Sequence, residues 1–189
     1  MQVDQARLRD DFHALMASAR LLDNAEGIKG WGFYELLDED GNLKQFGTFV
    51  NLITQVGDQY YGERASGIAS PPSQVSGMRL GTGTTAVAKT GAGAAIVTYV
   101  TGSSVAIDSG FPTSALSGSS RRIQWKTTWA AGVATANDIA EAVITNEATL
   151  TNVAGTAANT IARALLSPTV NKGASDTLAV TWNHDLLGA

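Results

Sequence analysis

The sequence predicts a mainly β fold, an antiparallel β-sandwich or barrel with one short internal helix and an N-terminal helical arm. The last third of the chain consists of short Thr-, Ala- and Val-rich segments separated by turn-forming residues, as in many all-β proteins. Residues 122–129 alternate apolar and polar side chains, which is typical of a half-buried strand. No regular alternation of strands with helices is visible, so a parallel α/β sheet is not expected.

Residues 3–22 are predicted to form the arm, a helix with one apolar side. Its apolar residues recur every three or four positions, as they do along one side of a helix, at Leu8, Phe12, Leu15, Ala19 and Leu22. Asp4 is a suitable N-cap, and Asp23 is a suitable stop. The helix either packs on its own domain or docks on a neighbouring subunit. We retain docking on a neighbouring subunit as an alternative because the segment that follows, residues 26–30, resembles a hinge.

A β-hairpin and a second helix are predicted to follow the arm. Side chains from Trp31 to Leu37 alternate between two faces, as in a strand, and Asp38 to Gly41 supply a turn. Leu43 to Val50 then form the second strand of the hairpin. Asn51 can cap a helix that runs from Leu52 to about Ala65. The residues of this helix expected to face the core are Leu52, Val56 and Tyr60 or Tyr61.

The rest of the chain is predicted to form short strands separated by turns. Residues 66–77 contain two consecutive prolines and form a loop. The predicted strands after this loop are Met78–Leu80, Ala95–Thr101, Arg122–Trp129, Ile139–Thr145, Thr160–Leu166 and a final strand around Leu178, Val180 and Trp182. Six separate short strands favour a sandwich or a barrel.

Length, composition and charge narrow the class of protein. A chain of 189 residues fits one domain with an appendage, and we divide it into an arm with hinge, residues 1–27, and a β-rich domain, residues 28–189. It contains no cysteine, which excludes thiolate chemistry. A net charge of −4 argues against general binding to nucleic acid or to an anionic membrane. Charged residues interrupt the N-terminus, so a signal peptide is not expected, and we expect synthesis in a cytoplasm.

Two glycine-rich motifs resemble nucleotide-binding loops. Gly81 to Ala86 has the outline GxGxxA, and Gly83 to Thr90 nearly matches a phosphate loop, with Ala88 where that motif requires glycine. Both motifs need a helix that begins directly after the loop, because its N-terminal amides hold the phosphate. The next residues, Val87 to Gly93, do not favour a helix. We therefore expect a flexible loop and no cofactor.

Other candidate sites lack the partners that their chemistry needs. Asp38, Asp40 and Asn42 offer oxygens to calcium but without the distal glutamate of a calcium loop, so a β-turn is the better interpretation. His13 and His184 are the only histidines, and neither has a second metal ligand or a base partner in view. The serines of residues 103–104 and 117–120 lie in no nucleophile motif. We expect no metal site and no catalytic residues.

One cluster combines basic and aromatic residues. Arg121 and Arg122 lie near Trp125 and Lys126, a combination that can contact an acidic partner or nucleic acid, although a solvated strand end is the simpler interpretation. Trp125 and Trp129 lie on one face of the predicted strand and would form a sugar-binding platform if exposed. Alternation favours the core for both.

Several stretches together resemble known proteins. They are Asn51–Gly57, Met78–Thr85, Ala162–Pro168, Asn171–Gly173 and Asp176–Trp182. In this order they resemble segments of virion structural proteins of tailed bacteriophages, found among head-decoration and tail or fibre proteins. The resemblance covers most of the β-rich domain. It implies a non-enzymatic virion component that binds other virion subunits.

We therefore expect a capsid decoration (cement) protein that binds major capsid protein subunits and stabilises the shell. It would be made in the host cytoplasm and located in the virion, with no membrane and no specific nucleic acid as partner. The arm would dock in an apolar groove of a partner, with help from two aromatic residues beyond the hinge. The expected partner-binding residues are Leu8, Phe12, Leu15, Leu22, Trp31 and Phe33.

Two alternatives remain open at this stage. A tail, collar or fibre component would have the same fold but contact tail subunits. A carbohydrate-binding module is the alternative from another class, because β-sandwiches often bind sugars through exposed aromatic residues. Symmetric assembly also favours a homo-oligomer, for which a trimer is attractive at quasi-threefold positions of a capsid.

Overall fold

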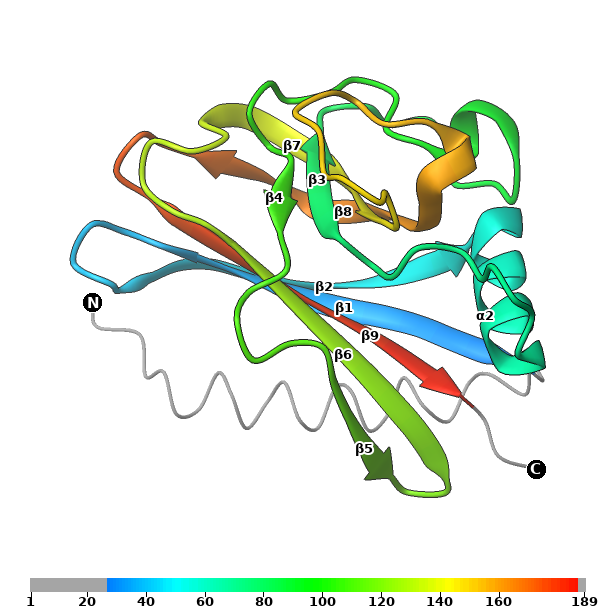
Figure 1. The fold of residues 1–189 in the computed structure, drawn as a ribbon. Coiled ribbons are helices and arrows are strands. Elements are labelled where there is room, and N and C mark those ends of the chain that lie inside the picture. The colour runs from blue at the N-terminus through cyan, green and yellow to red at the C-terminus, as the bar shows by residue number, and fades with distance from the viewer. Residues whose placement is uncertain (1–26, 187–189) are drawn as a thin grey trace.

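The computed structural model describes residues 27–186 as one antiparallel sheet of nine strands (Figure 1). The strands are β1 (Ile28–Leu37), β2 (Leu43–Ile53), β3 (Gly77–Gly81), β4 (Val105–Ala106), β5 (Thr113–Ser117), β6 (Ser120–Trp129), β7 (Ala136–Thr145), β8 (Thr160–Lys172) and β9 (Thr177–Leu186). Their order in the sheet is β4-β3-β7-β8-β2-β1-β9-β6-β5. The predicted mainly β, antiparallel fold is confirmed, in the form of a sheet that curls into a half-barrel. The predicted arm lies outside the described residues.

The predicted hairpin is present as β1 and β2. Their register places Trp31 opposite Val50 and Gly32 opposite Phe49. The turn forms because the Asp38 carboxylate accepts hydrogen bonds from the backbone N–H of two residues within it, Asp40 (3.0 Å) and Asn42 (2.8 Å). This use of Asp38 confirms the β-turn interpretation of the acidic segment.

The internal helix α2 (Gln55–Ser66) begins later than predicted. Asn51 does not cap it, because β2 continues to Ile53 and includes both Asn51 and Leu52. Thr54 is the N-cap instead, and its side-chain oxygen accepts a hydrogen bond from Gly57 N at 3.1 Å. Of the residues expected to face the core from this helix, Tyr60 is buried. The helix packs beside β8 and β2 at one end of the half-barrel (Figure 1).

Five of the later strands confirm the prediction, and one predicted strand is absent. β3, β6, β7 and β8 contain the predicted segments, and β9 contains the final one. The predicted strand Ala95–Thr101 is wrong: this segment forms a loop with one isolated bridge, Gly81 to Tyr99, after the short 3-10 helix η2 (Gly91–Ala94). β4 and β5 were not predicted. A second 3-10 helix, η3 (Ala157–Asn159), precedes β8.

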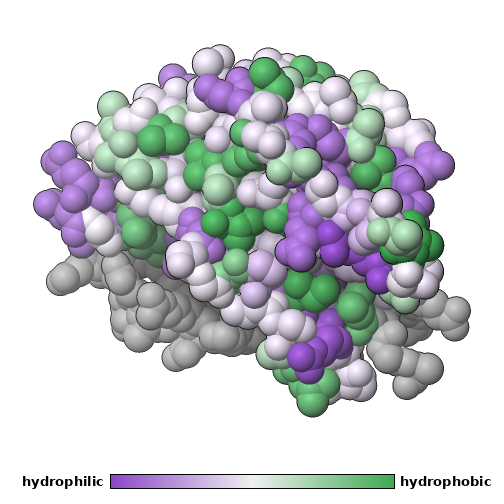
Figure 2. Space-filling view, in the orientation of Figure 1, coloured by the Kyte–Doolittle hydropathy of each residue, from purple (hydrophilic) through white to green (hydrophobic). Residues whose placement is uncertain are grey.

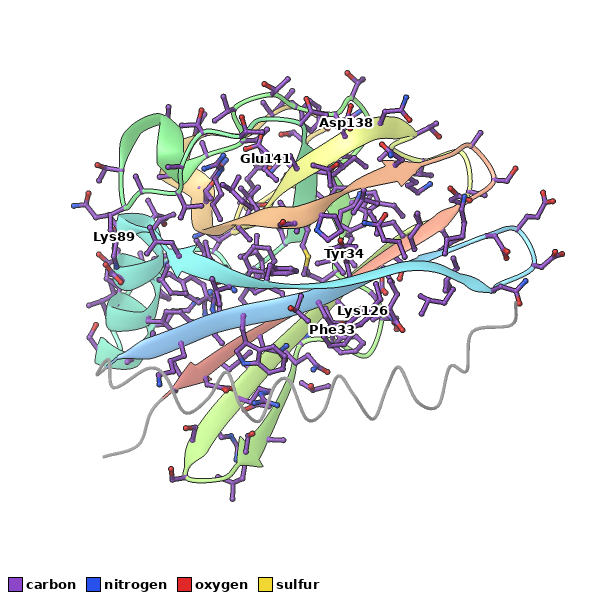
Figure 3. All side chains as sticks on the ribbon, turned by 180° about the vertical axis from the view of Figure 1, so that it is seen from behind. Phe33, Tyr34, Lys89, Lys126, Asp138 and Glu141 are labelled. Carbon is purple, nitrogen blue, oxygen red and sulfur yellow. The ribbon has the colours of Figure 1, made fainter. Side chains whose placement is uncertain are left out.

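The core fills the concave side of the half-barrel. Consecutive residues of β1 point to opposite sides of the sheet, with Tyr34 directed into the core and Phe33 directed outward (Figure 3). The largest fully buried apolar side chains of the core are Trp129, Trp182, Tyr34, Met78, Leu80, Ile139, Ile144, Ile161 and Leu178. Within the described residues, no helix is long and apolar enough to cross a membrane.

Loops cover the opposite, convex side of β3, β7 and β8. Arg163 and Glu141 point from the strands into these loops, and both side chains are fully buried. The Glu141 carboxylate accepts hydrogen bonds from the backbone N–H of Gly83 (3.0 Å), Val97 (3.0 Å) and Thr98 (2.9 Å). Burial on both faces explains why these strands lack the polar and apolar alternation of β6.

Candidate functional site

The sequence-predicted partner-binding residues that the structure describes lie on one surface. Trp31 and Phe33 belong to the outward-facing row of β1, on the convex side of the sheet. The neighbouring strands β2, β9 and β6 add their own outward rows, which include Val50, Asp185 and Arg122. We call this surface of β2, β1, β9 and β6 the outward face. The back view shows it with Phe33 and Lys126 labelled (Figure 3).

Polar contacts fix Trp31 in place on the outward face. Its indole Nε1–H donates to Asp185 Oδ2 at 3.2 Å. Arg122 binds both oxygens of the same carboxylate, at 2.7 and 2.9 Å, and its guanidinium lies 4.6 Å from the centroid of the Trp31 ring. Bidentate geometry and stacking on an aromatic ring both favour arginine here. The ring of Trp31 is thus held between a cation and a carboxylate.

Apolar side chains continue this surface along β1 and β2. The rings of Phe33 and Phe46 lie 6.0 Å apart, within the range of aromatic contacts. Val50, directly opposite Trp31, is 81% exposed. A single exposed apolar side chain is common on protein surfaces, whereas a group of them indicates an interaction site. Val50 lies next to an aromatic residue and so belongs to such a group.

The polar row of β9 is closely packed between its neighbours. Asn183 lies opposite Trp31 on one side and Gln124 on the other, and it is fully buried. Gln124 Nε2–H donates to Asn183 Oδ1 at 2.9 Å, whereas Asn183 Nδ2 has no hydrogen-bond partner among the described residues. The outward face is therefore a packed surface at this point and not an open groove.

The other four predicted partner-binding residues cannot be placed. Leu8, Phe12, Leu15 and Leu22 lie outside residues 27–186. The prediction that they form one apolar stripe therefore remains a prediction.

The glycine-rich motifs use their amides for internal contacts. The Gly83 N–H, which a phosphate would need, donates to the buried Glu141 carboxylate. Lys89 binds the carboxylate of Asp58 at 2.7 Å on the surface of α2. The segment after the motifs forms only the four-residue η2. A negative protein group thus occupies the position that a phosphate would need.

His184 belongs to a buried cluster of polar and aromatic residues. Its Nε2 accepts a hydrogen bond from Trp182 Nε1–H at 3.0 Å, and its Nδ1 lies 2.5 Å from the Tyr61 hydroxyl. The Trp125 ring packs edge-on at 5.2 Å from the imidazole. Burial lowers the pKa of His184 to about 3. The ring is therefore neutral. Because Nε2 accepts from Trp182, the ring proton lies on Nδ1, and this N–H donates a hydrogen bond to the Tyr61 hydroxyl oxygen. The other histidine, His13, lies outside the described residues.

Of the remaining candidates, Ser103, Trp125 and Trp129 have structural roles, whereas the Ser104 Oγ is buried without a hydrogen-bond partner among the described residues. Ser103 Oγ accepts from Leu80 N and donates to Leu80 O, both at 3.0 Å, which fixes this loop to β3. Trp125 and Trp129 are 2% and 0% exposed, so they form part of the core and offer no sugar platform. Trp125 also lies on the opposite side of β6 from Arg122 and Lys126, so the basic-aromatic cluster is not one surface. Among residues 27–186, no group of three His, Cys, Asp or Glu side chains could hold a metal.

Several contacts of this surface were not predicted, although Arg122 belongs to the basic-aromatic cluster noted in the sequence. Asp185 and Arg122 are 63 positions apart, and nothing in the sequence links them. Phe46 and Val50 could have been predicted from the hairpin, because its register places them on the same side as the outward-facing residues of β1.

Comparisons with protein-family models, curated proteins and solved structures gave no match.

Proposed function

We propose that this chain is a structural protein of a bacteriophage virion, a capsid decoration (cement) protein that binds major capsid protein subunits and stabilises the shell. The protein acts by adhesion and makes or breaks no covalent bond. The proposal has two supports: the resemblance of the β-rich domain to phage virion proteins, and the outward face.

The observation that carries the proposal is the position of Trp31 and Val50. They lie opposite each other on β1 and β2, close to where the chain enters the sheet from the arm. An exposed valine beside a fixed aromatic ring offers apolar area that a partner can cover. The arm and this part of the outward face together form the proposed contact with the capsid.

The use of charged groups within the fold also supports an adhesive role. Arg163 pairs with Glu141, Arg122 with Asp185, and Lys44 with Asp176 at 2.8 Å. Arg79 pairs with Glu147 as well. These pairs connect strands and loops to one another. Each of these groups therefore has a role in holding the fold together.

Deletion of residues 1–22 tests the role of the arm. The shortened chain is expected to keep the circular dichroism spectrum of a β protein but no longer to co-sediment with particles that lack the native protein. Full-length protein added to the same particles is the positive control. Undiminished binding of the shortened chain would refute the proposed docking of the arm.

A substitution on the outward face tests that surface separately. Val50→Glu places a charge where we propose apolar contact and is expected to reduce particle binding at least tenfold, because burial of an unpaired charge is unfavourable. Val153→Glu is the matched control, since Val153 is also exposed (55%) but lies in a loop away from β1 and β2. Equal binding by the two variants would contradict a role for the outward face.

The location of the protein in the particle distinguishes the shell from the tail. Antibody labelling or an image of the native particle should show the protein over the whole shell. Signal at a single vertex would instead identify a tail, collar or fibre component.

A further inference from the structure

The strand β5 forms one edge of the nine-stranded sheet. It pairs with β6 on one side, and among residues 27–186 no strand pairs with its other side. Thr113, Ser114, Ala115 and Leu116 are all exposed, Leu116 to 76%. The β5–β6 hairpin projects from the body of the half-barrel, so its edge is accessible (Figure 1). In the space-filling view, apolar and hydrophilic residues lie side by side at the projecting lower end of this face (Figure 2).

The register of the hairpin shows which backbone groups face outward from the edge. Ser117 pairs with Ser120 across a two-residue turn, which makes this pair hydrogen-bonded. Bonded and non-bonded pairs alternate along an antiparallel ladder, so Ala115 and Thr113 also bond to β6. The N–H and C=O groups of Ser114 and Leu116 therefore point away from β6.

The edge lacks the features that usually prevent further pairing. Proteins protect edge strands with charged residues, proline, bulges or covering segments. β5 has the sequence Thr-Ser-Ala-Leu-Ser, without charge or proline, and its pairing with β6 has no register shift. Arg121 covers part of the edge through two contacts with Ser114: its Nε–H donates to Ser114 Oγ at 2.8 Å, and its Nη2–H donates to Ser114 O at 3.3 Å. A carbonyl has a second lone pair, so this contact leaves room for another donor.

We infer that β5 pairs with β5 of a second copy of this chain, antiparallel and about a two-fold axis at Ala115. In this register Ser114 of one copy lies opposite Leu116 of the partner subunit, and the reverse pair forms by symmetry. All four outward N–H groups and all four outward C=O groups of the two edges then have partners. This inference does not depend on the proposed virion function.

The composition of β5 favours its own copy as the partner. The two edge-facing residues are symmetric about Ala115, so self-pairing satisfies both without a shift in register. β5 itself carries no charged residue, so no like charges lie directly opposite each other in the paired strands. The exposed Leu116 also becomes a diagonal neighbour of Leu116 of the partner subunit, within reach of a long side chain. A contact of this size is weak in dilute solution and gains strength when many copies assemble.

A single cysteine can trap the contact, because the chain contains none of its own. Ala115→Cys places two thiols across the axis, in a non-hydrogen-bonded pair with Cα atoms about 4.5 Å apart, which suits a disulfide. Thr113→Cys is the matched control on the same face of the same strand, where the two thiols would be more than about 12 Å apart. Under mild oxidation, the full-length A115C variant is expected to form covalent dimers at least tenfold faster than T113C. Equal rates, or faster dimerisation of T113C, would overturn the inference.

A second variant tests the outward amide itself. Leu116→Pro removes an N–H that faces the edge and leaves the bonds to β6 in place. In the A115C background it is expected to reduce the dimerisation rate to that of T113C, while the circular dichroism spectrum stays the same. An unchanged rate would overturn the inference. If L116P instead reduces binding to particles while A115C forms no dimer, β5 pairs with a different virion subunit, and the two-copy contact is refuted.

Discussion

Glu141 and Arg163 form an ion pair in which both side chains are fully buried, with Oε2 and Nη2 2.7 Å apart. The carboxylate also accepts three backbone amides from the glycine-rich loops, and the guanidinium donates to the carbonyl oxygens of Thr85 (2.8 Å) and Gly93 (3.3 Å). Two strands thus hold about fifteen residues of irregular chain through one pair of charges. The low charge and high glycine content of this segment do not disorder it, because the partners of its backbone groups come from β7 and β8.

Removal of the Glu141 carboxylate should destabilise the protein strongly. Glu141→Ala leaves a buried guanidinium without a counter-charge, and loss of one partner of a buried pair costs about 3–5 kcal/mol in the free energy of unfolding. Asp58→Ala is the control, because the exposed Asp58–Lys89 pair fixes the same loop and is expected to contribute less than about 1 kcal/mol. Urea unfolding of both variants measures the difference. Similar losses in the two variants would contradict a special role for the buried pair.

This pair also shows why part of the fold could not be predicted. The alternation of residues 122–129 and the hairpin at residues 31–50 are local patterns, and both predicted real strands. The apolar segment 95–101 looked equally like a strand. Its amides instead bond to Glu141, more than forty positions away, and no local pattern reveals that contact. The same limit applies to the outward face, where the sequence indicated Trp31 but not its partner Asp185.

The start of α2 illustrates a second limit, because Asn51 and Thr54 are both good N-caps. The strand register decides between them. Asn51 pairs with Gly30 and Ala164 in the sheet, and Thr54 is the first residue beyond β2.

Thr54 is therefore predicted to stabilise the start of α2. Its hydroxyl donates to Thr160 O at 2.5 Å and accepts from Gly57 N, so it joins the helix to β8. Thr54→Ala is expected to lower the free energy of unfolding by about 1–2 kcal/mol, while Thr54→Ser, which keeps the hydroxyl, should lose less than half as much. Equal losses of unfolding free energy in the two variants, measured by thermal or urea unfolding, would show that the methyl group of Thr54 matters and its capping hydroxyl does not.

His184 should make the protein less stable in mild acid. Its folded pKa of about 3 lies below the ordinary value of 6.5, so at intermediate pH the unfolded chain binds a proton that the folded chain does not. The contribution of neutral His184 to the free energy of unfolding is complete above pH 6.5 and is lost as the pH falls toward the pKa of the folded state, about 3. At about 1.4 kcal/mol per pH unit, this contribution falls by roughly 2 kcal/mol between about pH 7 and pH 5.

The control for this effect is His184→Gln, which removes the titrating group. Urea unfolding of both proteins at the two pH values cancels the other groups that titrate in this range. The native protein should lose about 2 kcal/mol more than the variant on acidification. Parallel losses would mean that His184 is not the source of the pH dependence.

Two glycines should respond in opposite ways to the same substitution. Gly32 lies on the inner row of β1, where an added methyl group would overlap both the ring of Phe49 and the backbone oxygen of Thr181. A ring can move, but the oxygen belongs to the paired strand β9, so Gly32→Ala is expected to cost about 1–3 kcal/mol. Gly62 lies within α2 with open space around it, so Gly62→Ala should stabilise the protein by about 0.5–1 kcal/mol. Both changes add one methyl group, so the two variants differ only in the space around the glycine. Opposite shifts of the urea midpoint would show that nothing larger than hydrogen fits between Gly32 and the ring of Phe49. Shifts of the same sign would contradict this packing.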